Sequence, residues 1–372
     1  MSLHAPRPLT IAFFGSSLVS AYWNGAATYY RGLVRALAAR GHRITFYEPD
    51  AYDRQRHRDI DDPPWAKVVV YAGNDLEGPR RALAEAASAD LIIKASGVGV
   101  FDAELEAGVL EHRRPGALTV FWDVDAPATL DRLDNNPEDP LRALIPRYDV
   151  VFTYGGGAPV VRRYKAKGAL RVMPIYNALD PETHHPTEPD PRFTADLALL
   201  ANRLPDREAR VDEFFFKPAI ALPHRRFLLG GSGWHDREMP TNVHYIGHVP
   251  TADHNALNAS ALAVLNVARD SMAACGFSPA TRVFEAAGAG ACILTDAWEG
   301  IELFLAPERE VLVARDGAEV ARVLSGLTPE RARLIGEAAR SRVLRHHTYT
   351  DRAAQVESLL ARLEPLGATF AP

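Results

Sequence analysis

Four polar side chains follow a Gly-Phe-Ser-Pro loop at three- and four-residue spacings: Ser278, Thr281, Arg282 and Glu285. Ser278 suits a helix N-cap, and the spacing places all four on one stripe of a helix predicted at 279–287. The free N–H groups at such an N-terminus suit a phosphate, and Glu285, one turn further, could accept two hydrogen bonds from a vicinal diol such as a ribose. The alternative is a solvated face on which Arg282 and Glu285 form an ion pair.

Other polar residues lie where predicted strands of the same half end, the edge at which open α/β sheets hold ligands. Arg207 follows the strand at 196–201 and Arg269 follows the strand at 261–266, so both could neutralise a phosphate. A surface ion pair is the alternative for each arginine, and simple packing is the alternative for His248. The further candidates are Gly231 and Ser232 after the strand at 226–229, Gly247 and His248 after the strand at 243–246, and Glu299 after the strand at 291–296.

A loop near the N-terminus is a further candidate for ligand binding. Asn24 and Gly25 lie between a buried strand at 9–14 and a helix at 25–40. Asn24 suits a helix cap and Gly25 allows close backbone approach, while a packing glycine in a βα turn is the alternative. The loop does not contain G-x-G-x-x-G, which argues against a nicotinamide dinucleotide site.

Two carboxylates, Asp123 and Asp125, follow the predicted strand at 118–122. They lie at the carboxyl end of that strand and could bind acceptor hydroxyls, or one of them could act as a general base. They could equally cap the helix that follows. The residue types alone leave these alternatives open.

Strand and helix patterns alternate through both halves, which predicts an α/β fold with parallel sheets. The chain has 372 residues and exceeds the size at which one core stops growing, so two Rossmann-like domains are expected. A proline-rich stretch without amphipathic period separates them. The predicted division is a first domain at 1–178, a linker and hinge at 179–195, a second domain at 196–345 and a C-terminal helical segment at 346–372.

Composition narrows the classes of partner. A formal net charge of -5 gives no electrostatic footprint for nucleic acid, and no apolar run approaches the length of an integral membrane segment. The two cysteines, Cys275 and Cys292, form no disulfide framework and no metal-ligand pattern, so a cytoplasmic location and no metal are expected. His112 and the pair His184 and His185 are interpreted as solvent-facing. A homodimer stays an open alternative.

Four stretches together resemble the CgeB-like bacterial glycosyltransferases of the GT-B fold. They are spread over most of the chain, so the resemblance concerns a whole architecture. The stretches are Phe14–Ser17 with Asn24–Gly32, Trp122–Pro127, Leu265–Arg269 and Ser278–Gly300.

The resemblance implies two Rossmann-like domains facing a central cleft, with a C-terminal helix crossing back to the first domain. It implies transfer of a sugar from a nucleoside-diphosphate donor, with a UDP-sugar favoured, to an acceptor hydroxyl. The reaction would be independent of metal and retaining, and no cofactor beyond the donor is expected. One departure concerns the sugar-contacting Glu that retaining relatives carry eight residues before the ribose Glu, because Phe277 stands there.

The resemblance also implies individual roles. Glu285 would hold the ribose and the loop at Ser278 would meet the diphosphate, which Arg207, in a Pro-Asp-Arg pattern, would neutralise. The backbone at Gly247 and His248 would pin the base, and Glu299 would lie near the donor sugar.

Other functions remain as alternatives on the same double fold. A nucleotide-sugar epimerase or a glycosyl phosphorylase would be a second enzyme class. A non-catalytic nucleotide-sugar-binding or assembly protein would be a third class. Turnover of the sugar donor would distinguish an enzyme from such a protein.

Overall fold

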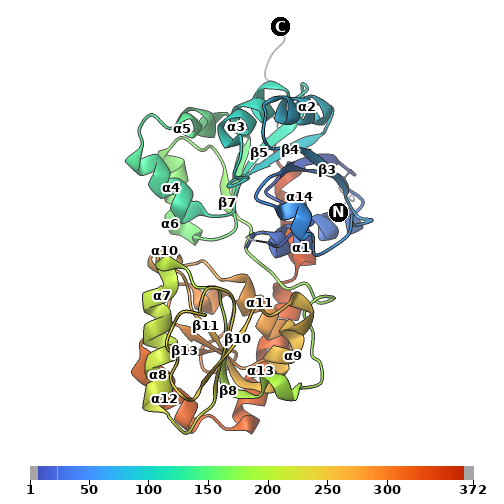
Figure 1. Cartoon of the computed structure of the whole chain (residues 1–372). Coiled ribbons are helices and arrows are strands. Elements are labelled where there is room, and N and C mark those ends of the chain that lie inside the picture. Colours follow the sequence, from blue (N-terminus) through green and yellow to red (C-terminus); the bar gives the residue numbers. More distant parts are fainter. Residues whose placement is uncertain (1–6, 23, 364–372) are drawn as a thin grey trace, which may run out of the picture. The chain divides into compact units, whose positions relative to one another are not determined.

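The computed structural model describes residues 7–22 and 24–363, which form two compact α/β units (Figure 1). Unit 1 contains the described residues up to Tyr176 together with those from Tyr349 onward. Unit 2 contains Asn177–Thr348. The segment 179–195, predicted as a linker, thus lies within unit 2, and the chain returns to unit 1 at Tyr349 rather than at residue 346.

The sheet of unit 1 has seven parallel strands in the order β3-β2-β1-β4-β5-β6-β7. Four of the five side chains of β1 are buried, as expected for a strand in the middle of a parallel sheet. The strands are β1 (Thr10–Phe14), β2 (Arg43–Asp50), β3 (Lys67–Ala72), β4 (Leu91–Ala95), β5 (Leu118–Asp123), β6 (Val150–Thr153) and β7 (Val172–Pro174). The helices are α1 (Ala27–Ala39), α2 (Glu77–Ala86), α3 (Asp102–Glu111), α4 (Ala126–Asn135), α5 (Pro140–Leu144), α6 (Gly157–Ala166) and α14 (Tyr349–Leu360), with 3₁₀ turns at Arg54–His57 and Ile145–Arg147.

The C-terminal helix α14 completes unit 1 by packing on α1, which confirms the predicted return of the chain to the first domain (Figure 1). Gly32 makes this approach close, because a side chain there would overlap the ring of Tyr349. Arg40 and His42, at the end of α1, hold the carboxylate of Glu357 on α14, with His42 Nε2 at 2.9 Å.

The sheet of unit 2 has six parallel strands in the order β10-β9-β8-β11-β12-β13. Figure 1 shows α7, α8 and α12 on one side of this sheet and α9, α11 and α13 on the other. The strands are β8 (Ala195–Leu200), β9 (Phe227–Gly230), β10 (Val243–Gly247), β11 (Ala261–Asn266), β12 (Ile293–Asp296) and β13 (Leu312–Ala314). The helices are α7 (Pro205–Val211), α8 (Lys217–Ala221), α9 (His254–Ser260), α10 (Asp270–Cys275), α11 (Thr281–Gly288), α12 (Gly317–Gly326) and α13 (Pro329–His346). A π-helical segment, Asp212–Phe216, joins α7 to α8, and 3₁₀ turns lie at Pro191–Phe193, Thr251–Asp253 and Ile301–Leu303.

The predicted linker is packed against unit 2. Phe193 is 5% exposed and belongs to an apolar cluster with Leu228 and Leu257. Leu179 pairs with Thr348 in an isolated β-bridge. Proline density correctly marked an irregular segment, but it could not show that apolar side chains anchor that segment to one unit.

The two units have the doubly wound arrangement predicted for Rossmann-like domains. Within each sheet the strand order reverses next to the first strand of the unit, β1 or β8, so ligand-binding loops are expected at the carboxyl ends there. Along the described chain, no helix is both long enough and apolar enough to cross a lipid bilayer.

Candidate functional site

Helix α11 carries the polar stripe on which the sequence analysis is centred, but it begins at Thr281 rather than at residue 279. Its N-cap residue is Ala280, and among the described residues no side chain caps it. Ser278 is buried and donates its hydroxyl proton to the carbonyl of Gly276 at 2.9 Å. The prediction of Ser278 as the cap was therefore wrong: this hydroxyl stabilises the preceding loop and leaves the helix N-terminus uncapped.

Three arginines of unit 2 come together beside this helix. Arg207 lies in α7, Arg269 precedes α10 and Arg282 lies in the first turn of α11. Burial and, to a smaller extent, the positive charges of Arg282 and Arg269 together lower the pKa of Arg207 to about 10, against the opposing effect of Asp206. Three partly buried guanidinium groups that repel one another attract a multiply charged anion.

Two of these guanidinium groups have unused donors. Nε of Arg207 and one terminal nitrogen of Arg282 are buried and have no hydrogen-bond partner in the part of the chain that the structure describes. Leaving such a donor unpaired costs about 1–3 kcal/mol, so native proteins rarely do it without a reason. Arg269 differs, because its Nε donates to the carboxylate of Asp206 at 2.6 Å.

Glu285 lies one turn beyond Arg282 and is 7% exposed. Its side chain is not directed to bulk solvent. An exposed Glu285 would have argued against a role in ligand binding. A nitrogen of Arg282 lies 3.9 Å from its carboxylate, too long for a hydrogen bond. Although burial opposes ionisation, electrostatic interaction with His184, Arg282 and His254 holds the pKa of Glu285 below its ordinary value. Thr281, predicted on the same stripe, is half-buried at the start of the helix.

The glycine-rich loop after β9 is fastened to the loop after β8. Gly231 has a φ of +118°, and a side chain there would overlap the carbonyl of Ala201. The amide of Ser232 donates to Oδ1 of Asn202 at 2.9 Å. A terminal nitrogen of Arg207 donates to the carbonyl of Asn202 at 2.8 Å, so the two loops also support an arginine of the cluster.

The other candidates of unit 2 lie on neighbouring loops. Gly247 has a φ of +72° and faces open space, and His248 is exposed. Glu299 has an exposed side chain, and its carbonyl accepts a hydrogen bond from the amide of Phe277 at 2.6 Å. Phe277 itself has a φ of 48° and packs against Gly300, so the two loops are held together by backbone contact.

In unit 1, Asn24 organises the loop between β1 and α1 rather than capping the helix. Its Nδ2 donates to the carbonyls of Ser17 and Ser20 at 2.9 and 3.0 Å, and its Oδ1 accepts from the hydroxyl of Ser16 at 2.9 Å. The N-cap of α1 is Ala26. Gly25 is exposed and faces open space, as a position for close backbone approach requires.

Asp123 is completely buried, and its carboxylate accepts four hydrogen bonds. The donors are the hydroxyls of Ser96, Thr129 and Tyr164 at 2.7, 3.0 and 2.5 Å and the amide of Asp125 at 3.0 Å. Burial raises its pKa against these bonds. Three of these bonds reach Oδ1 and one reaches Oδ2, and the side chain has no exposed surface, so this placement favours a positioning role.

Asp125 is half-buried two residues later, at the N-cap position of α4. Within the described chain its side chain makes no cap hydrogen bond. The capping alternative therefore accounts for where Asp125 lies but gives its carboxylate no capping role. Of the two predicted carboxylates, Asp125 is half-buried, whereas Asp123 is fully enclosed.

Two residues near Glu285 were not among the predicted site residues. His184 is 2% exposed, which makes its interpretation as solvent-facing wrong, whereas His112 and His185 are exposed. His254 begins α9, and burial and the charge of Arg282 lower its pKa to about 4. A histidine pair seventy residues apart gives no local spacing signal, so only the tertiary fold reveals it.

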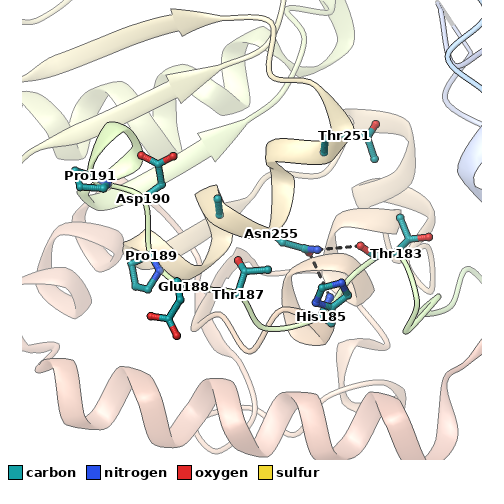
Figure 2. A pocket seen from close by; sticks show the side chains of 11 residues that line it. Thr183, His185, Thr187, Glu188, Pro189, Asp190, Pro191, Thr251 and Asn255 are labelled. Atoms are coloured by element: carbon teal, nitrogen blue, oxygen red, sulfur yellow. Dashed lines mark hydrogen bonds between the residues drawn. The ribbon is translucent and has the colours of Figure 1, made fainter.

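A surface pocket of about 810 Å³ lies beside α9 (Figure 2). Thr183, His185, Asp190, Thr251 and Asn255 are among the residues that line it. None of the predicted site residues lies in its wall, so it is separate from the arginine cluster.

Comparison with known proteins supports the fold seen here. Residues 207–358 match the family described as "Glycosyl transferase-like". No curated protein sequence matches the chain. Among solved structures, sucrose-phosphate synthase from Thermosynechococcus elongatus is 16% identical with a TM-score of 0.70, covering 96% of this chain and 99% of that chain.

Two further structures are similar over nearly their whole length. HepE from Anabaena, solved with UDP and glucose, is 13% identical with a TM-score of 0.68 and covers 95% of this chain and 99% of that chain. An alpha-glucosyltransferase in complex with UDP is 10% identical with a TM-score of 0.70, covering 95% of this chain and 100% of that chain. The chain therefore has the GT-B fold of glycosyltransferases; the specific CgeB-like type stays a resemblance.

Proposed function

We propose that the protein is a glycosyltransferase that moves a sugar from a nucleoside-diphosphate donor to an acceptor hydroxyl. The observation that carries the proposal is the pair of buried, unpartnered guanidinium donors of Arg207 and Arg282 beside the uncapped N-terminus of α11. A diphosphate would satisfy both donors and the helix N–H groups together. UDP is the favoured nucleotide, because structures with this fold were solved with UDP.

The arginine cluster also supplies the chemistry that the reaction needs. Negative charge accumulates on the departing diphosphate in the transition state, and preorganised donors aimed at it typically contribute a few kcal/mol each. Arg207, Arg269 and Arg282 can meet that charge without a metal ion. Independence of metal and retention of anomeric configuration are part of the proposal, and retention rests on the resemblance alone.

The remaining residues of unit 2 take roles around this anion. Glu285, ionised and one turn along the helix, accepts the ribose hydroxyls in this proposal. The backbone at Gly247 and His248 faces the base, and Gly231, Ser232 and Glu299 line the adjoining loops. In unit 1, Asp125 serves the acceptor hydroxyl, with Asn24 and Gly25 shaping the loop after β1. A cytoplasmic location belongs to the proposal as well, since the described cysteines Cys275 and Cys292 form no disulfide.

A ligand-induced shift in melting temperature tests the donor site. We expect UDP to stabilise the wild type, by about 2.7 kcal/mol at a hundred times its dissociation constant, and uridine to do much less. Arg207→Met and Arg282→Met should each weaken UDP binding roughly 10- to 100-fold. Arg203→Met is the matched control, because Arg203 lies in the loop just before α7 but is paired with Glu208 and Asp236 at 2.5 and 2.8 Å.

Turnover then separates an enzyme from a binding protein. Release of UDP from UDP-glucose, slow without an acceptor and faster with one, should be lost in the two arginine variants. A wild type that binds UDP and never releases it from a donor, across UDP-sugars and hydroxyl acceptors, would support the assembly protein instead. Equal stabilisation by UDP in wild type and both arginine variants would remove the proposed site.

A further inference from the structure

Three side chains that can ligate a metal converge in unit 2. His184 comes from the irregular segment before the 3₁₀ turn at Pro191–Phe193, His254 begins α9 and Glu285 lies in α11. One ligand atom of each lies within 4.8 Å of the others. His184 and Glu285 are 2% and 7% exposed, and His254 is half-buried.

Both histidines direct an unused ring nitrogen into the protein. Nε2 of His184 and Nδ1 of His254 are buried and have no hydrogen-bond partner among residues 7–22 and 24–363. Nε2 of His254 lies 3.3 Å from the carbonyl of Val249. A carbonyl can only accept, so this nitrogen carries the proton and Nδ1 is left with its lone pair. Metal-binding histidines are oriented in this way by a carbonyl on their other nitrogen.

Asn255 of α9 is hydrogen-bonded to the irregular segment at Thr183 and His185 (Figure 2). Nδ2 of Asn255 donates to the carbonyl of Thr183 at 2.9 Å, and its Oδ1 accepts from the amide of His185 at 3.3 Å. Asn255 directly follows His254 in the sequence and binds the residues on both sides of His184. These hydrogen bonds therefore hold the two histidines close together. The amide of His184 also donates to the carbonyl of Asp180 at 2.9 Å.

We propose that His184, His254 and Glu285 bind a divalent transition-metal ion, in the first place Zn²⁺. Two imidazoles and a carboxylate form a donor set typical of zinc, whereas Ca²⁺ and Mg²⁺ prefer oxygen ligands. Tetrahedral zinc with bonds of about 2.0–2.1 Å places its ligand atoms roughly 3.4 Å apart. The ligand atoms, now within 4.8 Å of one another, need to close by up to about 1.4 Å, and a fourth position would be taken by water.

Arg282 sets a limit on this site. Its guanidinium lies 3.9 Å from one carboxylate oxygen of Glu285, so a metal ion on the other oxygen would be opposed by a nearby positive charge. We therefore expect weaker binding than at a closed structural zinc site. Because Glu285 is also the proposed ribose ligand, Zn²⁺ and a nucleotide would compete for it. The metal proposal itself requires no nucleotide and goes beyond the glycosyltransferase proposal.

The test measures Zn²⁺ alone on the chelator-treated full chain. Calorimetry should show one ion per chain for the wild type, and Co²⁺ should give the intense visible absorption of a tetrahedral site. His254→Asn, His184→Asn and Glu285→Gln should each weaken Zn²⁺ binding at least tenfold. His185→Asn is the matched control, since this exposed histidine is adjacent to His184 and should leave the affinity unchanged.

His254 is half-exposed at the start of a helix, so His254→Asn should fold even where the substitution of buried His184 does not; circular dichroism checks each variant. Absence of saturable binding, or equal binding in His185→Asn and His254→Asn, would overturn the proposal. Failure of the metal site leaves the UDP measurements on Arg207→Met and Arg282→Met untouched, so the two proposals fail independently.

Discussion

A guanidinium nitrogen of Arg282 lies 3.9 Å from the carboxylate of Glu285, three residues further along α11, and both side chains are largely buried. The pair is close enough for charge attraction but too far apart for a direct hydrogen bond. In the free protein each group therefore remains available to a ligand. This arrangement suits a helix that receives a phosphate at its first turn and a ribose at its second.

Substitution of this pair should be strongly non-additive in the absence of ligand. Arg282→Met leaves an unpaired buried carboxylate, and Glu285→Gln leaves an unpaired buried guanidinium, each at a cost of roughly 3 kcal/mol. The double variant removes both charges and should cost less than the sum of the two single costs. Urea denaturation of the four proteins measures this coupling, and simple additivity would show that the two charges do not interact.

The loop after β9 should tolerate no side chain at Gly231. Alanine there requires an unfavourable φ of +118° and overlaps the carbonyl of Ala201, so Gly231→Ala should lower stability by about 2–4 kcal/mol and weaken UDP binding. Gly247→Ala is the matched control for stability. It also has a positive φ, +72°, but a side chain there meets open space, so only about 1 kcal/mol of backbone strain is expected. Thermal unfolding of both variants compares them, and equal losses would contradict the steric argument.

The sequence predicted the architecture well because its signals are local and repeated. Apolar runs such as Leu9–Phe14 and Ala261–Asn266 mark buried strands wherever they occur, and their alternation with helices determines the fold class. Short elements between loops gave weaker signals. Strand β13 and helix α10 were not identified, since a three-residue strand or a six-residue helix carries too little periodicity.

The details of the site depended on contacts that no local pattern contains. Ser278 and Asn24 both have cap chemistry, yet each satisfies a neighbouring loop instead. His184 lies in a charged, proline-rich stretch that suggests exposure, but Asn255 holds that stretch against α9. The identity of the polar residues was predictable, whereas their partners depended on elements distant in the sequence.

The two carboxylates after β5 should behave differently when neutralised. Asp125→Asn should reduce sugar transfer with little change in stability or UDP affinity, because the residue is half-buried and belongs to unit 1. Asp123→Asn should instead lower the stability by about 2–4 kcal/mol, since the amide cannot accept all four hydrogen bonds. Melting temperatures and initial rates on the same preparations separate the two effects. Loss of activity in Asp123→Asn with unchanged stability would contradict this prediction and indicate that Asp123 acts in catalysis.

A buried carboxyl group in unit 1 predicts an unusual dependence of stability on pH. Glu106 in α3 is 3% exposed, and burial raises its pKa from 4.5 to about 7, with Lys94 and Arg132 opposing this and Asp102 adding to it. Its folded pKa is higher than its unfolded pKa, so the folded state binds more protons between these values. The stabilisation from Glu106 is fully present below about pH 4.5 and is lost as the pH rises to about 7.

Glu106→Gln removes this ionisation while keeping the shape of the side chain. The variant should match the wild type at about pH 4 and exceed it by about 3 kcal/mol at about pH 8, as the raised pKa requires. Glu104→Gln, an exposed position on the same helix, should show no such divergence. Urea denaturation at both pH values provides the comparison. A constant difference between Glu106→Gln and wild type across this range would mean that Glu106 ionises in the folded protein as readily as in the unfolded chain.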